Sequence, residues 1–120
     1  MSTYIKDVLE AHQEWLDSSG ERGERAVLHE AILQQADLHD ANLERADLKG
    51  ARLSVSDLMR ANFKDADLSR CDLWMSDMKD TVLEGADLRG ADLSEVTNLT
   101  SGQVANAITD AETKLPEGVG

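Results

Sequence analysis

The sequence has few aromatic residues, one cysteine and no long apolar run, and each shortage excludes a class of protein. Aromatic residues make up 3% of the 120 residues, so small aliphatic side chains must build the core, and an aromatic-lined cofactor pocket is not expected. The one cysteine, Cys71, excludes an internal disulfide framework and a cysteine-based zinc site. No apolar stretch is long enough to cross a bilayer, and residues 1–7 lack a secretory signal pattern. We therefore expect a cytoplasmic protein with no cofactor and no membrane contact.

Basic residues are also scarce relative to acidic ones. The chain has 24 acidic and 12 basic residues, a formal net charge of −12. Such a charge repels phosphate backbones and anionic lipid surfaces, so direct binding to nucleic acid or to a membrane is not expected. The charge instead favours a basic protein partner, or one that normally binds DNA.

A period of five residues organises most of the chain. A large apolar residue occupies every fifth position from 28 to 93, and a small residue stands two places before it. The large residues are Leu28, Leu33, Leu38, Leu43, Leu48, Leu53, Leu58, Phe63, Leu68, Leu73, Met78, Leu83, Leu88 and Leu93. The small positions hold alanine except at Ser56, Cys71, Ser76 and Thr81. Residues 26–95 therefore hold fourteen units.

Neither a helix nor a continuous strand can bury this pattern. A five-residue step turns an α-helix by about 140°, which spreads the leucines around its axis, and an odd period alternates between the two faces of a strand. Three extended residues (small inward, polar outward, large inward) followed by a two-residue turn do fit. The chain then winds as a coil with leucine inside, although the spacing alone does not fix the number of sides. A triangular winding with fifteen-residue laps stays open.

The units resemble the pentapeptide-repeat family, whose consensus reads Ala-(Asp/Asn)-Leu-X-X. Residues 36–40, 41–45 and 86–90 match it closely. The resemblance implies an all-β solenoid, a right-handed quadrilateral β-helix with four units per lap and about 3.5 coils. The outward middle position departs from Asp or Asn in four units, which predicts that the first coil is partly covered. These departures are Val27, Ile32, Arg52 and Val82.

The flanks are expected to cap the two ends of the coil. Residues 1–25 form an N-terminal capping helix and linker, with Ser2 or Thr3 as N-cap and apolar residues at helical spacing. Residues 26–95 form the β-helix, and 96–120 a C-terminal capping helix and tail. A capping box beginning at Thr100 predicts a short helix to about Ala107, and residues 113–116 are expected to cross the open end.

With four units per lap, residues twenty apart stack on one face, and the aspartates form three acidic columns. These are Asp37, Asp57 and Asp77; Asp47, Asp67 and Asp87; and Asp72 and Asp92. Carboxylates about 5 Å apart occur in retaining glycosidases, but a convex coil offers no cleft, so the acids are interpreted as turn-stabilising groups. Like-charge repulsion predicts modestly raised pKa values in the middle of the columns.

No combination of residues indicates catalysis or metal binding. The sequence has no Ser-His-Asp set and no phosphate loop. His29 and His39 lie two units apart, hence on opposite faces, and His12 lies in the predicted cap, so the histidines cannot share an ion. Cys71 occupies a small inward position and replaces an alanine there. An enzyme is not expected.

One apolar patch is predicted on the charged surface, formed by Val55, Met59, Trp74 and Met75. Patches of this kind mark interfaces, with tryptophan as the favoured energetic anchor. The patch contacts an unknown protein partner, contacts a second copy in a homodimer, or is covered by the protein's own linker or tail.

Two functions follow from these features. The first is a non-enzymatic protein-interaction scaffold with an acidic surface and an exposed apolar patch. The alternative rests on the resemblance, because some members of the family mimic DNA and modulate a type II topoisomerase, gyrase. The negative charge agrees with mimicry. A coil only about 15 Å tall and the interspersed basic residues argue against it.

Overall fold

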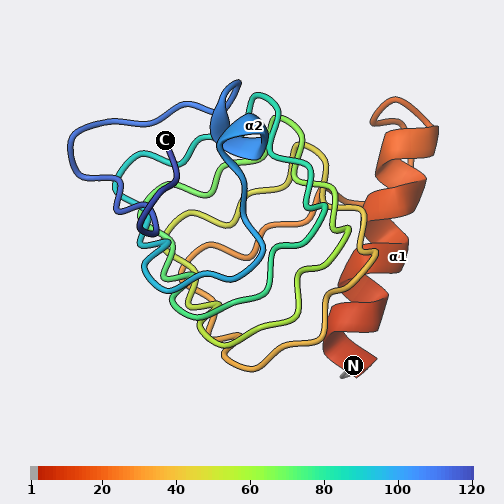
Figure 1. Cartoon of the computed structure of the whole chain (residues 1–120). Helices are drawn as coiled ribbons and strands as arrows, with labels where there is room; N and C mark the ends of the chain where they lie inside the picture. Colours follow the sequence, from red (N-terminus) through yellow and green to blue (C-terminus); the bar gives the residue numbers. More distant parts are fainter. Residues whose placement is uncertain (1–2) are drawn as a thin grey trace.

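The computed structural model describes residues 3–120, which form a stack of coils between two helical segments (Figure 1). Helix α1 spans Thr3–Asp17 and helix α2 spans Ser101–Val104. Between them the chain winds in wide laps that lie one above another and are joined by parallel β-bridges. Of the two expected N-caps, Ser2 lies outside the described residues and Thr3 is the first residue of α1.

The register of the bridges fixes the number of sides. Val27 pairs with Asp47, Ile32 with Arg52, and the same offset continues to the pair of Asp77 and Thr97. Each pair is twenty residues apart, so one lap contains four five-residue units, and the triangular alternative is wrong. Each side of a lap contributes a single bridged residue, so within residues 3–120 the laps are joined by isolated β-bridges and not by extended strands.

Backbone hydrogen bonds repeat with the same period. The amide of Asp57 donates to the Ala36 carbonyl over 2.9 Å, and the amide of Leu38 donates to the Asp57 carbonyl over 2.9 Å. At each corner the fifth residue of the unit turns the chain through the left-handed region, as at Asp65 with φ 56°. Gly85 occupies such a corner with φ 71°, and a Cβ there would displace the Asp65 carboxylate of the preceding lap.

The inside of the coil is packed with the large residues of the repeat. Twelve of them, among them Phe63, Leu68 and Met78, are 0–1% exposed, with alanines between them. The polar replacements at the small position have a clear role, because the Ser76 hydroxyl donates to the Leu53 carbonyl over 2.7 Å and the Thr81 hydroxyl to the Leu58 carbonyl over 2.7 Å. A buried hydroxyl is tolerated where it finds such a partner.

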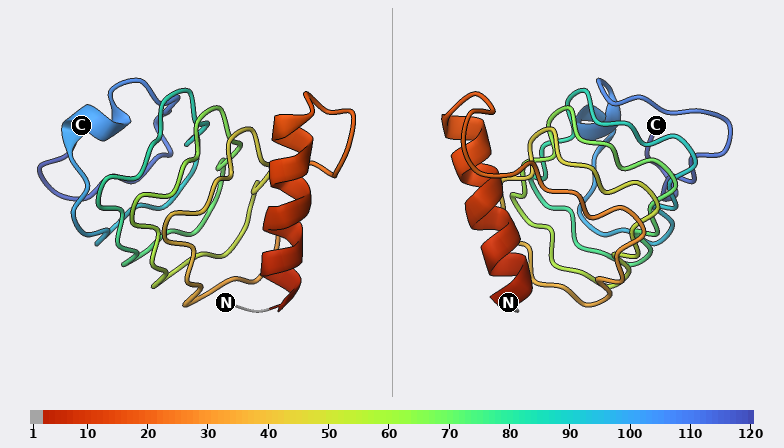
Figure 2. Two further views of the ribbon diagram at one scale, coloured as in Figure 1. Left: turned by 90° about the vertical axis from the view of Figure 1, so that its right-hand side faces the viewer. Right: turned by 180° about the vertical axis from the view of Figure 1, so that it is seen from behind.

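Helix α1 lies across the end of the stack where the coil begins, as the left view of Figure 2 shows. Its buried side chains are Ile5 and His12. His12 holds the helix to the coil, because its Nδ1 accepts from the Ala26 amide over 2.9 Å and its Nε2–H donates to the Glu44 carbonyl over 2.8 Å. The Trp15 ring packs under Arg45, whose guanidinium carbon lies 5.1 Å from the ring centroid.

At the other end the regular spacing stops near residue 95, but the pairing between laps does not. Ile108 pairs with Asp87 and Lys114 with Asp92, at offsets of 21 and 22 residues, so the C-terminal flank supplies bridges of a further lap. Helix α2 starts with the expected capping box of Thr100 and Gln103. It ends at Val104, three residues before the predicted end.

Helix α1 covers the end of the first coil (Figure 2), but the outward side chains that predicted a cover are exposed. Val27 and Ile32 in the first coil are 51% and 71% exposed, and Val82 in the third is 41% exposed, so these departures do not mark a covered side. The reason is that α1 covers the end of the stack and leaves its sides open (Figure 2). No helix within residues 3–120 is both long and apolar enough to span a membrane.

Candidate functional site

The bridges place the predicted aspartate columns on three of the four faces. Asp37, Asp57 and Asp77 follow one another on one face; Asp47, Asp67 and Asp87 on another; Asp72 and Asp92 on a third. On the fourth face Asn42 pairs with Asn62, and Asn62 with Val82.

The carboxylates of the columns are occupied by their own turns. Oδ1 of Asp57 accepts from the Met59 amide over 3.1 Å, and Oδ1 of Asp72 accepts from the Trp74 amide over 3.1 Å. Asn62 makes the same contact with the amide of Lys64 over 3.0 Å. A short side chain with an oxygen at this position therefore satisfies the turn, whether it is charged or not.

Hydrogen bonds lower the pKa of several of these acids. The His39 ring and amide lower the pKa of Asp37, the Arg89 guanidinium lowers that of Asp87, and Ser94 lowers that of Asp92. Burial works in the opposite direction at Asp47, but hydrogen bonds from the Lys49 amide and from His29 outweigh it, and its pKa is also lowered. These four acids lie at the ends of their columns, where hydrogen bonds determine the direction of the shift, so the raised pKa values expected in the middle of the columns stay a prediction.

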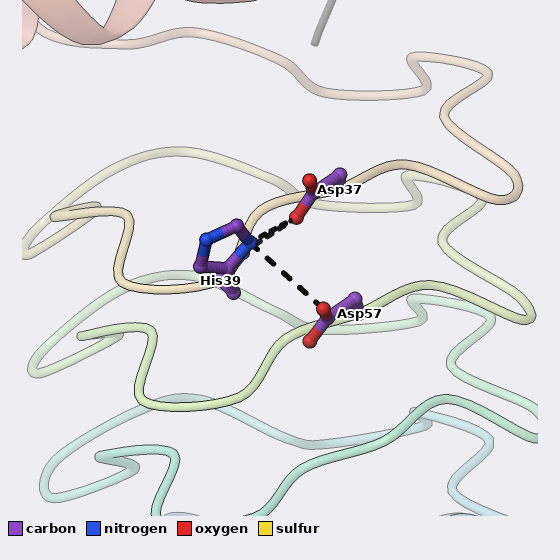
Figure 3. Close-up of side chains that lie close together, drawn as sticks. All are labelled: Asp37, His39 and Asp57. Atoms are coloured by element: carbon purple, nitrogen blue, oxygen red, sulfur yellow. Dashed lines mark hydrogen bonds and ion pairs between the residues drawn. The ribbon is translucent and has the colours of Figure 1, made fainter.

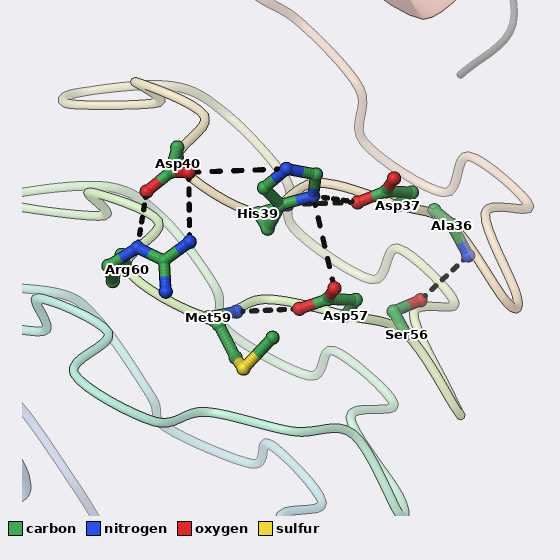
Figure 4. Close-up of polar contacts among 8 residues, drawn as sticks. All are labelled: Ala36, Asp37, His39, Asp40, Ser56, Asp57, Met59 and Arg60. Carbon is green, nitrogen blue, oxygen red and sulfur yellow. Dashed lines mark hydrogen bonds and ion pairs between the residues drawn. The ribbon is translucent and has the colours of Figure 1, made fainter.

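A histidine sits within one of the columns. The His39 Nδ1–H donates to Asp37 and lies 3.9 Å from Oδ2 of Asp57, one lap further on (Figure 3). Its Nε2 lies 4.0 Å from Oδ2 of Asp40, whose carboxylate receives two hydrogen bonds from Arg60, of 2.6 and 3.0 Å (Figure 4). This cluster was not predicted from the sequence. A histidine two residues after an aspartate, with a second aspartate twenty residues after the first, is the pattern that would have indicated it.

Among residues 3–120, Asp37, His39 and Asp57 are the one group of three Asp, Glu, His or Cys side chains whose potential ligand atoms lie within 4.8 Å of one another, and they are largely exposed. The Nδ1 that faces both carboxylates already donates to Asp37, so a proton on His39 supplies the positive charge. The pKa of His39 is accordingly raised, first by the hydrogen bond with Asp37 and then by the negative charges of Asp37, Asp57 and Asp40.

Cys71 is buried and has a partner inside the coil. Its Sγ–H donates to the Leu48 carbonyl over 2.8 Å, and burial raises the pKa of the thiol to about 12. The thiol is therefore uncharged at neutral pH and is held as an inward-facing small side chain.

The predicted apolar residues divide between two corners. Val55, Trp74 and Met75 lie at one corner and are 45%, 43% and 47% exposed. Met59 is half-buried at the next corner, where its side chain lies beside Asp57 (Figure 4). Neither the linker nor the tail covers the first three, which we call the apolar corner.

A family comparison identifies the repeat. The model for pentapeptide repeats matches residues 24–58, 36–74 and 61–97, more than half of the chain. The chain belongs to the pentapeptide-repeat family. Its fold is accordingly the right-handed quadrilateral β-helix of that family, in agreement with the twenty-residue register.

Solved structures of other pentapeptide-repeat proteins are similar to this one. A protein from Nostoc PCC 7120 is 28% identical, with a TM-score of 0.72, over 92% of this chain and 86% of its own. One from the Arabidopsis thaliana thylakoid lumen is 24% identical, with a TM-score of 0.60 over 76% of this chain. This chain spans 57% of the length of the Arabidopsis protein. No curated protein matches the chain significantly.

We expect His39 to give this pentapeptide-repeat protein a pH-dependent contribution to stability. A pKa raised by folding contributes stability that is fully present below about pH 6.5 and is lost as the pH rises through the folded pKa. Replacing His39 with glutamine should remove that dependence. Urea unfolding of both proteins at pH 5.5 and pH 8.5 measures the difference, with His29→Gln as the matched exposed control. An identical pH dependence of the wild type and His39→Gln would contradict the assignment.

Proposed function

We propose that this pentapeptide-repeat protein is a non-enzymatic scaffold that binds another protein through the apolar corner. The carrying observation is that Val55, Trp74 and Met75 lie together at one corner and remain about half exposed, whereas the other exposed apolar residues of the repeats, Val27, Ile32 and Val82, lie on three different faces. Exposed apolar groups gathered at one place are typical of a contact surface. Trp74 is the expected anchor, because tryptophan is enriched among the residues that dominate binding energy.

The backbone at the apolar corner supports this proposal. Val55 and Met75 have φ of 57° and 60°, in the left-handed region that branched side chains disfavour. Equivalent corner positions elsewhere hold Gly50, Gly85 or charged residues such as Asp65. An exposed valine with strained φ contributes little to the stability of the coil, and a gain on binding accounts for its presence.

The charges around the apolar corner favour a partner with basic residues. Asp57 and Asp77 lie on the face that follows it, and Asp72 lies on the face that precedes it. In a contact between two copies these carboxylates would approach one another, and like charges across an interface oppose association. A partner that presents an apolar group flanked by Lys or Arg avoids that repulsion, so we favour it over a homodimer.

Affinity capture with matched variants tests the proposal. The bait is the full chain, compared with a Trp74→Ala, Met75→Ala double variant and with Val82→Ala, which removes an exposed apolar side chain on another face. We expect a basic protein to be retained by the wild type and by Val82→Ala, and its affinity for the double variant to fall at least tenfold. Equal retention by all three would refute the role of the apolar corner. Sedimentation of the same proteins identifies self-association, the rival outcome.

A gyrase supercoiling assay distinguishes the scaffold from the alternative function, a DNA mimic that modulates a type II topoisomerase. The aspartate columns favour DNA mimicry, whereas Arg60 and Arg89 neutralise Asp40 and Asp87 on the same surface. Inhibition by the wild type that survives in the Trp74→Ala, Met75→Ala variant would favour the topoisomerase modulator over the scaffold. No effect on supercoiling would leave the scaffold as the better account.

A further inference from the structure

A groove of about 530 Å³ lies at the corner that follows the Asp47 column, one face before the apolar corner. The coil contributes Lys49, Ser69, Arg70 and Arg89 to its lining. Three of these four side chains are cationic, in a chain whose formal net charge is −12. A concave surface that gathers positive charge on such a protein calls for a ligand of the opposite sign.

An extra residue near the C-terminus creates the groove. Ile108 and Lys114 pair with successive units of the preceding lap but are six residues apart, so the loop between them bulges. The segment after α2 projects to the left of the coils in Figure 1. From this loop Asp110 and Glu112 form the far wall of the groove.

Two of the charged groups in the groove already have hydrogen-bond partners. Asp110 accepts from the amides of Gly90, Glu112 and Thr113 over 3.0–3.1 Å, so its carboxylate holds the loop to the coil. The Arg89 guanidinium donates two hydrogen bonds to Asp87, of 2.9 and 2.7 Å. Neither group is free to bind a ligand at full strength.

Lys49 and Arg70 differ from the other cations of the groove. Within residues 3–120 neither side chain makes a hydrogen bond or an ion pair. Gly90 occupies the same corner as Arg70, one lap further on. A Cβ at Gly90 would lie 3.0 Å from Cγ of Arg70. The missing side chain therefore leaves the guanidinium uncovered on that side. Two unpaired cations, one of them a planar guanidinium, suit a phosphate group better than a monocarboxylate.

We propose that this groove binds a small phosphorylated molecule through its phosphate group, held by Lys49 and Arg70. The volume is in the range of small-molecule sites, and the rim of the loop provides polar contacts for the rest of the ligand, whereas the Ser69 hydroxyl already donates to Asp67. Asp110 and Glu112 oppose the phosphate from the far wall and limit its affinity. This site is independent of the apolar corner and of the proposed scaffold function.

An NMR titration tests the proposal with inorganic phosphate, and with acetate at the same ionic strength and pH. We expect saturable shifts of the amide resonances of Lys49, Ser69, Arg70 and Gly90 with phosphate, and no saturation with acetate. Equal binding of the two anions would overturn the assignment to phosphate. Shifts spread over all cationic residues, or none that saturate, would overturn the site itself.

Charge variants should change the affinity for phosphate in opposite directions. Lys49→Gln and Arg70→Gln should each weaken phosphate binding about tenfold, because each loses a charge-assisted contact. Glu112→Gln should tighten it by roughly two- to fivefold, because a repulsive charge at the rim is removed. Lys79→Gln is the matched control, an exposed lysine outside the groove, and should leave binding unchanged. The same loss in Lys79→Gln as in Arg70→Gln would show that only net charge matters.

Discussion

Replacing His12 with alanine should lower the free energy of unfolding by about 3–5 kcal/mol and release α1 from the coil. The side chain is fully buried, and both ring nitrogens bond to backbone groups of the first laps. Without the imidazole, the Ala26 amide and the Glu44 carbonyl lose their partner, and each such orphan costs about 1–3 kcal/mol. The ring also stacks on Trp15, with centroids 5.6 Å apart, so a cavity adds to the loss.

The measurement is urea unfolding at pH 8, followed by tryptophan fluorescence and by far-ultraviolet circular dichroism. His29→Ala is the matched control, because that histidine is exposed and its ring is paired with the Asp47 carboxylate. It should change the free energy of unfolding by less than about 0.5 kcal/mol. Equal stability of His12→Ala and the wild type would show that α1 does not depend on this contact.

The pH dependence of the same contact has a defined sign. Burial lowers the pKa of His12, because removal from water disfavours the charged imidazolium, and Nδ1 accepts from the Ala26 amide only while it is unprotonated. A histidine with a depressed folded pKa contributes stability that is present above the unfolded value near 6.5 and is lost as the pH falls through the folded pKa. This trend is opposite to that of His39, so the two histidines separate when each is replaced alone.

The sequence predicts the coil because one local rule repeats in every unit. Alternation of small, polar and large residues fixes which side chains are buried, and Leu38, Phe63 and Leu88 lie inside as the period requires. The number of sides is not contained in that rule, since the angle at each corner depends on the backbone. It came from the resemblance and is settled by pairs such as Asp37 with Asp57.

Contacts between laps were harder to predict, because they depend on where long side chains reach. The sequence places His39 on the surface of the coil but not the direction of its ring. The ring turns back to Asp37 and also lies near Asp57 of the next lap. The bridges of Ile108 and Lys114 were missed for a related reason. A bulged loop breaks the period without breaking the pairing, and a search for a fixed spacing stops where the period does.

Replacing Phe63 with alanine should lower the free energy of unfolding by about 3–5 kcal/mol. Phe63 is fully buried and is the bulkiest side chain inside the coil. The backbone is held by the laps on either side, because the Phe63 amide donates to the Val82 carbonyl over 2.9 Å and the Asn62 amide to the Ala41 carbonyl over 2.8 Å, so the walls cannot collapse into the space. In a chain of this length such a loss corresponds to a fall in Tm of about 10–20 °C.

Two further variants show whether volume is the cause. Phe63→Leu restores the consensus residue and should cost less than about 1.5 kcal/mol, because most of the space is refilled. Val82→Ala removes an exposed side chain from the residue that pairs with Asn62 and should change stability by about 0.5 kcal/mol or less. If Phe63→Leu were as damaging as Phe63→Ala, the ring itself and not the filled volume would hold the laps together. If Phe63→Ala were not damaging either, the laps would close around the gap, because each lap of a solenoid contacts only its neighbours and can shift along the axis.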